Sequence, residues 1–166
     1  RYLAGHPSVR AATGKELQYL SLHHGRGERW YRAHFPVRPP GVLSFEASPY
    51  YLFDPAAPAR AAALLPDARF IALLRDPVER AYSAHAHERA RGFETEDFAT
   101  ALALEESRLA GEAERLAADP DYTSHSHQHH GYLQRGHYAE HLERHEAVFG
   151  RERMHVVDSH RFFTEP

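Results

Sequence analysis

The stretch that decides the fold runs from Arg69 to Ser83 and reads Arg-Phe-Ile-Ala-Leu-Leu-Arg-Asp-Pro-Val-Glu-Arg-Ala-Tyr-Ser. Its first part, which ends at Leu74, is nearly continuous apolar sequence of strand length, typical of a buried parallel strand. Pro77 suits the first position of a helix, and Asp76 before it can cap the helix N-terminus. The apolar run by itself also fits a short core helix. We expect a strand, a turn and a helix.

Strands and helices are expected to alternate on both sides of this stretch. A short extended segment is predicted at 15–20 and a polar loop at 119–136. Alternation of this kind indicates an α/β fold with a mostly parallel central sheet flanked by helices. No internal repeat or interdomain linker is visible, so residues 1–166 are expected to form a single domain. Further strands are predicted at 42–46 and 154–158, and helices at 28–34, 59–65, 77–91, 95–110 and 137–149, with Thr95 as a cap.

Composition excludes several classes of protein. Hydrophobic residues make up 42% of the chain and charged residues 26%, which is typical of a globular domain. The net charge of −3 gives no general attraction to nucleic acid or to anionic membranes. The sequence has no cysteine, no apolar run near the roughly 20 residues that span a bilayer, and no apolar signal-peptide core. We therefore expect a cytoplasmic protein with no nucleic-acid or membrane partner.

The junction that follows Leu74 has the chemistry of an anion site. In an open α/β sheet, ligands bind where strands end and helices begin. The first amides of the helix are expected to be unpaired, and the helix dipole attracts an anion. Arg75 can offer two donors to a phosphate, and the Ser83 hydroxyl lies two turns into the helix. On this pattern alone, an ordinary turn with an exposed arginine is the alternative.

The particular residues of this junction point to a family. Arg-Asp-Pro-x-x-Arg-x-x-Ser after an apolar strand resembles the 3′-phosphate-binding motif of sulfotransferases that use 3′-phosphoadenosine-5′-phosphosulfate (PAPS). The resemblance implies a P-loop-like nucleotide-binding fold in which Arg75 and Ser83 hold the 3′-phosphate. Arg80 is expected to pair structurally with a carboxylate.

Gln-Arg-Gly-His-Tyr at 134–138 resembles the loop that closes over the 3′-phosphate and the adenine in the same family. The resemblance implicates Arg135, Gly136 and Tyr138 in nucleotide binding. Phe-Glu-Ala-Ser-Pro-Tyr-Tyr at 45–51 is similar to a segment that lies near the acceptor cleft. These segments follow one another in the order expected for the family.

Two further residues gain catalytic roles from the resemblance. Thr-Gly-Lys-Glu-Leu-Gln-Tyr-Leu at 13–20 resembles the Lys-Glu segment of the heparan-sulfate type of sulfotransferase, the N-deacetylase/N-sulfotransferases and 3-O-sulfotransferases. In that group the glutamate is the proposed general base, which assigns the role to Glu16. His87 lies one helical turn beyond Ser83, and its counterpart in the N-sulfotransferase branch is implicated in catalysis.

One element of the family is not found in the sequence. A loop of the form Lys-x-Gly-Thr-Thr holds the 5′-phosphosulfate and precedes the segment that residues 1–3 resemble. Residues 163–166 resemble a point where the family continues into further helices. We therefore expect a partial domain, incomplete at both ends. Lys15, the one lysine, is a weak substitute for the lysine that stabilises the leaving group, so turnover by this fragment alone is an open question.

Histidines form two clusters, in the polar loop and along the predicted helix at 137–149. Zinc and nickel sites use such spacings. The loop shows no ordered scaffold in sequence, however, and the helical set fits a solvated face, so we expect no metal. A histidine-rich lip that reads a polar acceptor is a further interpretation. The clusters are His125, His127, His129 and His130, and His137, His141 and His145.

The sequence therefore predicts a sulfotransferase that moves a sulfuryl group from PAPS to a hydroxyl or amine of a small molecule or glycan. The heparan-sulfate resemblance motivates the glycan, although relatives of one fold accept different molecules. Two alternatives come from other classes of protein. One is a different nucleotide-dependent transferase, such as a small-molecule kinase, and the other is a non-enzymatic, histidine-rich metal-binding or interaction module.

Overall fold

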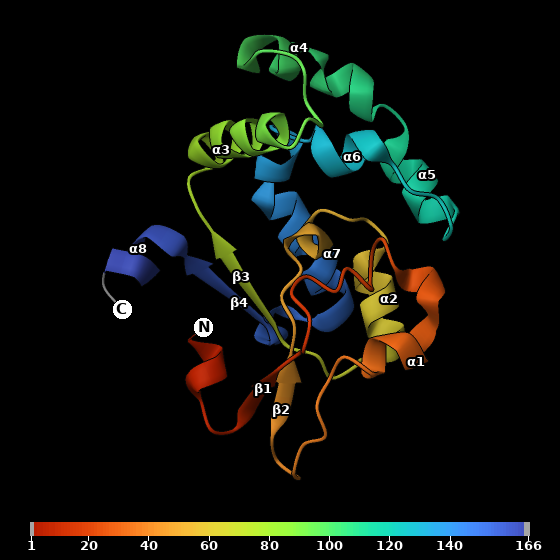
Figure 1. The fold of residues 1–166 in the computed structure, drawn as a ribbon, viewed down its shortest axis with the longest axis vertical. Helices are drawn as coiled ribbons and strands as arrows, with labels where there is room; N and C mark the ends of the chain where they lie inside the picture. The colour runs from red at the N-terminus through yellow and green to blue at the C-terminus, as the bar shows by residue number, and fades with distance from the viewer. Residues whose placement is uncertain (1, 165–166) are drawn as a thin grey trace.

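The computed structural model describes residues 2–164 and shows an α/β fold of parallel strands connected by helices (Figure 1). The strands form two separate parallel pairs rather than one central sheet. β1 (Val9–Ala11) pairs with β2 (Leu43–Phe45). β3 (Phe70–Leu74) pairs with β4 (Met154–Asp158). The predicted fold class is confirmed, with the sheet divided in two.

Each parallel pair keeps its carboxyl ends together. Leu74 at the end of β3 lies opposite Asp158 at the end of β4. Between the two pairs lies a cavity of about 560 Å³, which is lined in part by β2 and by Phe70 at the start of β3. Because the chain passes directly from β3 into a helix, the N-terminus of that helix lies at the edge where parallel sheets bind ligands.

Helices make up much of the remaining chain. In Figure 1, α3 to α6 lie together at one end of the molecule, while α1, α2 and α7 lie nearer the strands. Contacts join α3 to α4, α4 to α6, α5 to α6 and α2 to α7. No helix within residues 2–164 is long and apolar enough to cross a membrane. The α-helices are α1 (Gly27–Arg32), α2 (Ala57–Leu64), α3 (Pro77–Ala90), α4 (Phe98–Leu109), α5 (Glu112–Ala118), α6 (His125–His129), α7 (Tyr138–Phe149) and α8 (Ser159–Thr164). The 3-10 helices are η1 (Leu3–Gly5), η2 (His24–Arg26), η3 (Pro49–Leu52), η4 (Gln134–Gly136) and η5 (Arg151–Arg153).

The buried apolar side chains form two clusters. The smaller one joins α3 and α4 through Tyr132, whose side chain is 1% exposed and packs on Ala81 and Ala101. Burial of a large apolar side chain contributes roughly 1.5–3 kcal/mol, so Tyr132 is a principal tie between these helices and the segment before η4. The larger cluster consists of Leu17, Tyr19, Leu20, Tyr31, Ala57, Ala61 and Phe149.

Most predicted elements are confirmed within a few residues, but three predictions are wrong. The helix expected from Thr95 begins at Phe98, because Asp97 caps it by accepting a hydrogen bond from the Thr100 amide at 2.9 Å. The segment at 119–136 is not simply a polar loop. It contains α6, which begins where the Ser124 hydroxyl caps the helix. β1 and α5 were not predicted. Earlier expectations for residue 1 and residues 165–166 lie outside the described residues.

The third wrong prediction concerns 15–20, which is a turn rather than an extended segment. Glu16 and Gln18 both adopt left-handed backbone conformations, with φ of 51° and 53°. Leu17 and Tyr19 between and after them are buried, at 5% and 4% exposure. Because the turn places Leu17 and Tyr19 in the core, the backbone at Glu16 and Gln18 is held in a conformation that costs on the order of 1–3 kcal/mol for residues other than glycine.

Candidate functional site

A cavity of about 580 Å³ lies at the carboxyl end of β3 and along one face of α3. We call it the anion cavity. Most of the residues selected from the sequence contribute to its wall. These are Arg75, Ser83, His87, Arg135 and Tyr138. The structure thus brings the 75–87 segment together with the 135–138 segment, as the sequence predicted for a single ligand site.

The N-terminus of α3 is closed by its own cap. Pro77 occupies the first turn, and the Asp76 carboxylate accepts hydrogen bonds from the amides of Val78 at 2.9 Å and Glu79 at 3.0 Å. The predicted cap is confirmed. Because these two amides already donate to Asp76, they are not available to an anion as the sequence predicted. Binding of an anion here therefore depends mainly on side chains.

Arg75 follows β3 and is exposed. Its Nη2 donates to the carbonyl oxygen of Glu79, which folds the side chain back along the first turn of α3. The guanidinium group is therefore held at the mouth of the anion cavity, with its remaining N–H groups available to a ligand.

One face of α3 lines the cavity. Arg80, Ser83, Ala84, His87 and Glu88 recur at the spacing of a single helical face. Ser83 and His87, which sequence reasoning selected, belong to this set. Arg80 was assigned to a structural ion pair with a carboxylate, and that assignment is wrong. In the sequence, the helical spacing of Arg80 with Ser83 and His87 is the signal that could have placed Arg80 in the cavity wall.

Arg80 instead contacts the backbone of a distant segment. Its Nη2 donates to the carbonyl oxygen of Tyr132. The tertiary structure brings α3 against the segment before η4, and this placed a carbonyl where we expected a carboxylate.

Buried donors without partners surround the anion cavity. Within residues 2–164, Arg80 Nε and Arg135 Nε are buried and have no hydrogen-bond partner. The Tyr138 hydroxyl lies close enough to the Arg80 guanidinium to interact with it, but no hydrogen bond of regular geometry satisfies it. A buried donor without a partner costs roughly 1–3 kcal/mol, and native proteins keep few of them. The two unpaired Nε–H groups beside this cavity, Arg80 and Arg135, are donors that an anionic ligand could satisfy.

Arg135 is held in a fixed orientation. Its Nη2 donates to the carbonyl oxygens of His127 at 3.1 Å and Gln128 at 2.5 Å. The guanidinium carbon lies 5.2 Å from the ring centroid of Tyr50 and 5.1 Å from that of Phe53. These contacts leave Nε as the donor that lacks a partner.

The positive charges of the anion cavity repel one another. Burial lowers the pKa of Arg135, and the nearby Arg80 guanidinium lowers it further. Burial likewise lowers the pKa of Arg80, with Arg75 adding to the effect. Glu88 also lines the cavity, and its carboxylate accepts a hydrogen bond from His129 Nδ1 at 3.0 Å. A bound dianion would relieve the repulsion between the guanidinium groups.

Gly136 lies beside the cavity wall rather than in it. A Cβ at this position would be 3.1 Å from the Cβ of Pro77, which is tighter than ordinary packing. The absence of a side chain therefore allows η4 to pack against the start of α3, next to Arg135.

Lys15 and Glu16 do not line the anion cavity. Lys15 Nζ lies 3.7 Å from Glu16 Oε1, and both side chains are exposed. Their turn lies close to the cavity, since the Gln18 amide donates to Ser48 Oγ at 3.1 Å and the next residue, Pro49, lines the wall. The predicted base lies outside the lining of the anion cavity and separate from the cluster of arginines.

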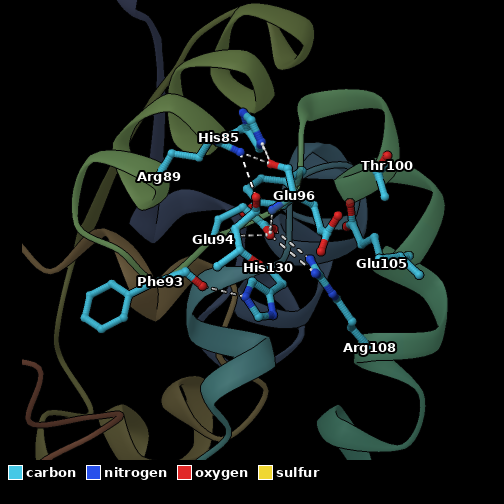
Figure 2. A network of polar contacts seen from close by, with 12 residues as sticks. His85, Arg89, Phe93, Glu94, Glu96, Thr100, Glu105, Arg108 and His130 are labelled. Atoms are coloured by element: carbon cyan, nitrogen blue, oxygen red, sulfur yellow. Dashed lines mark hydrogen bonds and ion pairs between the residues drawn. The ribbon is translucent and has the colours of Figure 1, made fainter.

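A buried polar network links the segment after α3 to α4 (Figure 2). At its centre the side chain of Glu94 is fully buried and accepts from Arg108 Nη1 at 2.7 Å. It also accepts from the Tyr132 hydroxyl at 2.9 Å and from the amides of Thr95 and Glu96. Burial opposes the ionisation of Glu94, but Arg108 and these donors together lower its pKa to about 2.

The histidine clusters are built into the core. His127 on α6 is 2% exposed, its Nδ1 shares a hydrogen bond of 2.6 Å with the Tyr50 hydroxyl, and its ring stacks on Phe53. His141 and His145 on α7 are also buried. The expected unscaffolded loop and solvated face are therefore wrong at these positions. No group of three side chains within residues 2–164 is arranged to hold a metal ion.

Comparison with known proteins shows the family of the chain. A crystal structure of a sulfotransferase from Alicyclobacillus acidocaldarius superposes with a TM-score of 0.77 and 31% identity, over 100% of this chain and 69% of that one. The chain belongs to the sulfotransferase family. The family predicted from the sequence is thereby confirmed, although no family model matches the chain.

Curated relatives in the sulfotransferase family are similar along almost the whole chain. Bifunctional heparan sulfate N-deacetylase/N-sulfotransferase 1 of Mus musculus is 33% identical over 99% of this chain. Heparan sulfate glucosamine 3-O-sulfotransferase 3B1 of Homo sapiens is 30% identical over 99% of this chain. This chain spans only 18% of the first relative and 38% of the second.

Proposed function

We propose that this protein transfers the sulfuryl group of PAPS to a hydroxyl or amine of an acceptor. The observation that carries the proposal is the pair of buried, unpaired Nε–H groups of Arg80 and Arg135, with the Tyr138 hydroxyl beside them, around one cavity in a chain of the sulfotransferase family. They are arranged for an anion with several oxygens, which the 3′-phosphate of PAPS supplies.

The residues of the anion cavity fit such a nucleotide. Planar guanidinium groups match the geometry of phosphate oxygens, and Arg75, Arg80 and Arg135 provide three of them. The hydroxyls of Ser83 and Tyr138 can complete the set. A volume of about 580 Å³ lies within the usual range for small-molecule sites. PAPS, when bound, supplies the activated sulfuryl group.

We assign activation of the acceptor to Glu16 and His87. Transfer forms a bond from sulfur to the acceptor oxygen or nitrogen, breaks the bond to the 5′-phosphate, and releases the acceptor proton. An exposed carboxylate can take that proton, and Glu16 is exposed on a turn with a left-handed backbone conformation. His87 lines the cavity itself and is exposed to a ligand there. Lys15 lies 3.7 Å from Glu16 and is the one lysine that could substitute for the lysine that stabilises the leaving group.

A glycan is the acceptor that similarity favours. Both curated relatives carry heparan sulfate in their names. The expected cytoplasmic location stays a prediction, as does the division of roles between Lys15, Glu16 and His87.

Calorimetry with adenosine 3′,5′-bisphosphate tests the proposed function. The wild type should bind it, and Arg75→Ala and Ser83→Ala should each weaken binding at least tenfold. Arg29→Ala is the control, because Arg29 is an exposed arginine of α1 that does not line the anion cavity. ATP binding of equal strength, without preference for a 3′-phosphate, would instead favour a kinase. Sulfuryl transfer from PAPS to heparan-type oligosaccharides then tests the acceptor.

A further inference from the structure

The segment that carries Arg135 has little regular structure to hold it. η4 is a 3-10 helix of 3 residues, and the side chain of its N-cap residue, Leu133, makes no capping hydrogen bond. The amides just before Arg135 are nevertheless bound by one side chain from α4. Glu105 Oε1 accepts from the Leu133 amide at 2.9 Å and from the Gln134 amide at 2.8 Å, and Oε2 accepts from the Leu133 amide at 2.7 Å.

Glu105 is an unusual choice for this position. It is 2% exposed, and burial of a carboxylate is costly unless hydrogen bonds compensate it. Its hydrogen bonds go to backbone amides rather than to a guanidinium group. Hydrogen bonds to an ionised acceptor are shorter and stronger than neutral ones. Its negative charge also stabilises the nearby guanidinium groups of Arg80 and Arg135.

The carbonyl groups of the same segment are held from two other helices. His141 Nε2 on α7 donates to the Gln134 carbonyl at 2.8 Å. Arg144 donates to His141 Nδ1 at 2.9 Å, which fixes the tautomer that carries its proton on Nε2. On α3, Arg80 donates to the Tyr132 carbonyl. Side chains from three helices thus bind the backbone on both its donor and acceptor sides.

We propose that Glu105 is a positioning residue, which presets η4 so that Arg135 and Gly136 are ready to bind the 3′-phosphate. This inference rests on the proposed function of the anion cavity. Glu105 does not line that cavity and acts through the backbone of Leu133 and Gln134. We call the hydrogen bonds from the Leu133 and Gln134 amides to Glu105 the clamp. Without the clamp, η4 would have to become ordered when the nucleotide binds, and this cost would lower the affinity for the nucleotide.

Glu105→Gln is the informative substitution, because it keeps the size of the side chain and replaces one acceptor oxygen by a donor. Glu106→Gln is the matched control, since Glu106 is the next residue on α4 and is exposed. The readout is the ratio of the dissociation constants of adenosine 5′-monophosphate and adenosine 3′,5′-bisphosphate. Glu105→Gln should lower this ratio about tenfold, as expected for lost charge-assisted bonds. Glu106→Gln should leave it unchanged.

A second measurement covers the case in which Glu105→Gln does not fold. In the wild type without nucleotide, the amides of Leu133 and Gln134 should exchange with deuterium far more slowly than those of an open loop. Fast exchange that slows only when nucleotide binds would overturn the proposal, as would an unchanged ratio in folded Glu105→Gln. If the wild type fails to bind adenosine 3′,5′-bisphosphate, the proposed function fails, while slow exchange would still identify the clamp.

Discussion

Arg80→Lys tests most directly whether the unpaired donors of the anion cavity bind the nucleotide. The substitution keeps one positive charge but removes the planar fork and the Nε–H group that lacks a partner. If charge alone attracts the ligand, lysine should serve as well as arginine. If directed hydrogen bonds matter, affinity for adenosine 3′,5′-bisphosphate should fall.

The expected loss follows from the contacts of Arg80. A hydrogen bond to a charged group is worth about 1.5–3 kcal/mol, which corresponds to a rise in the dissociation constant of roughly 10-fold to 150-fold. Folding stability should change less. The lost bond to the Tyr132 carbonyl costs about 1 kcal/mol, and removal of a buried unpaired donor returns a similar amount. We expect the free energy of unfolding to change by no more than about 1 kcal/mol, or about 2–4 °C in melting temperature.

Titration calorimetry at fixed salt, together with thermal unfolding, measures both quantities. Arg29→Lys is the control, because Arg29 does not line the cavity. Unchanged nucleotide affinity in Arg80→Lys would refute the directed hydrogen bond. A melting temperature lowered by more than about 10 °C would show instead that Arg80 acts mainly in folding.

Three further predictions concern other parts of the site. Burial, with the charges of Arg135 and Arg144, lowers the pKa of His127 to about 3. As the pH falls, His127 therefore becomes protonated in the unfolded chain before it does in the folded protein. The free energy of unfolding measured with urea should fall as the pH drops from about 6.5 toward 3. His127→Gln should flatten that slope, and an unchanged slope would contradict the assignment. Glu94→Gln should lower the free energy of unfolding by about 3 kcal/mol at pH 7, measured with urea in a double-mutant cycle with Arg108→Ala. In the wild type, the stabilisation that ionised Glu94 contributes is present above pH 4.5 and is lost as the pH falls toward 2. Glu16→Gln should keep nucleotide affinity but slow turnover about 10²-fold to 10⁴-fold, and wild-type turnover would exclude Glu16 as the base.

Local features of this protein were determined by residues close together in the sequence. β3, the turn and α3 follow from an apolar run, a capping carboxylate and a proline at the first helical position, and each acts on its immediate neighbours. Ser83 and His87 could be placed on one face because helical spacing is fixed. The motif at 75–83 indicated the family together with the segments at 13–20, 45–51 and 134–138, because all of them follow the order expected for that family.

Tertiary structure decided which polar groups are buried and which have hydrogen-bond partners. Arg80 and the carbonyl of Tyr132 lie 52 positions apart, and nothing local in either segment indicates that they meet. The same is true of Glu105 and the amides before Arg135, which lie 28 and 29 positions away. His127 was expected in a loop without an ordered scaffold because its neighbours in sequence are polar, yet contacts with Tyr50 and Phe53 bury it. Hydrogen bonds and burial between distant segments depend on how helices pack, and that packing left the Nε–H groups of Arg80 and Arg135 without partners.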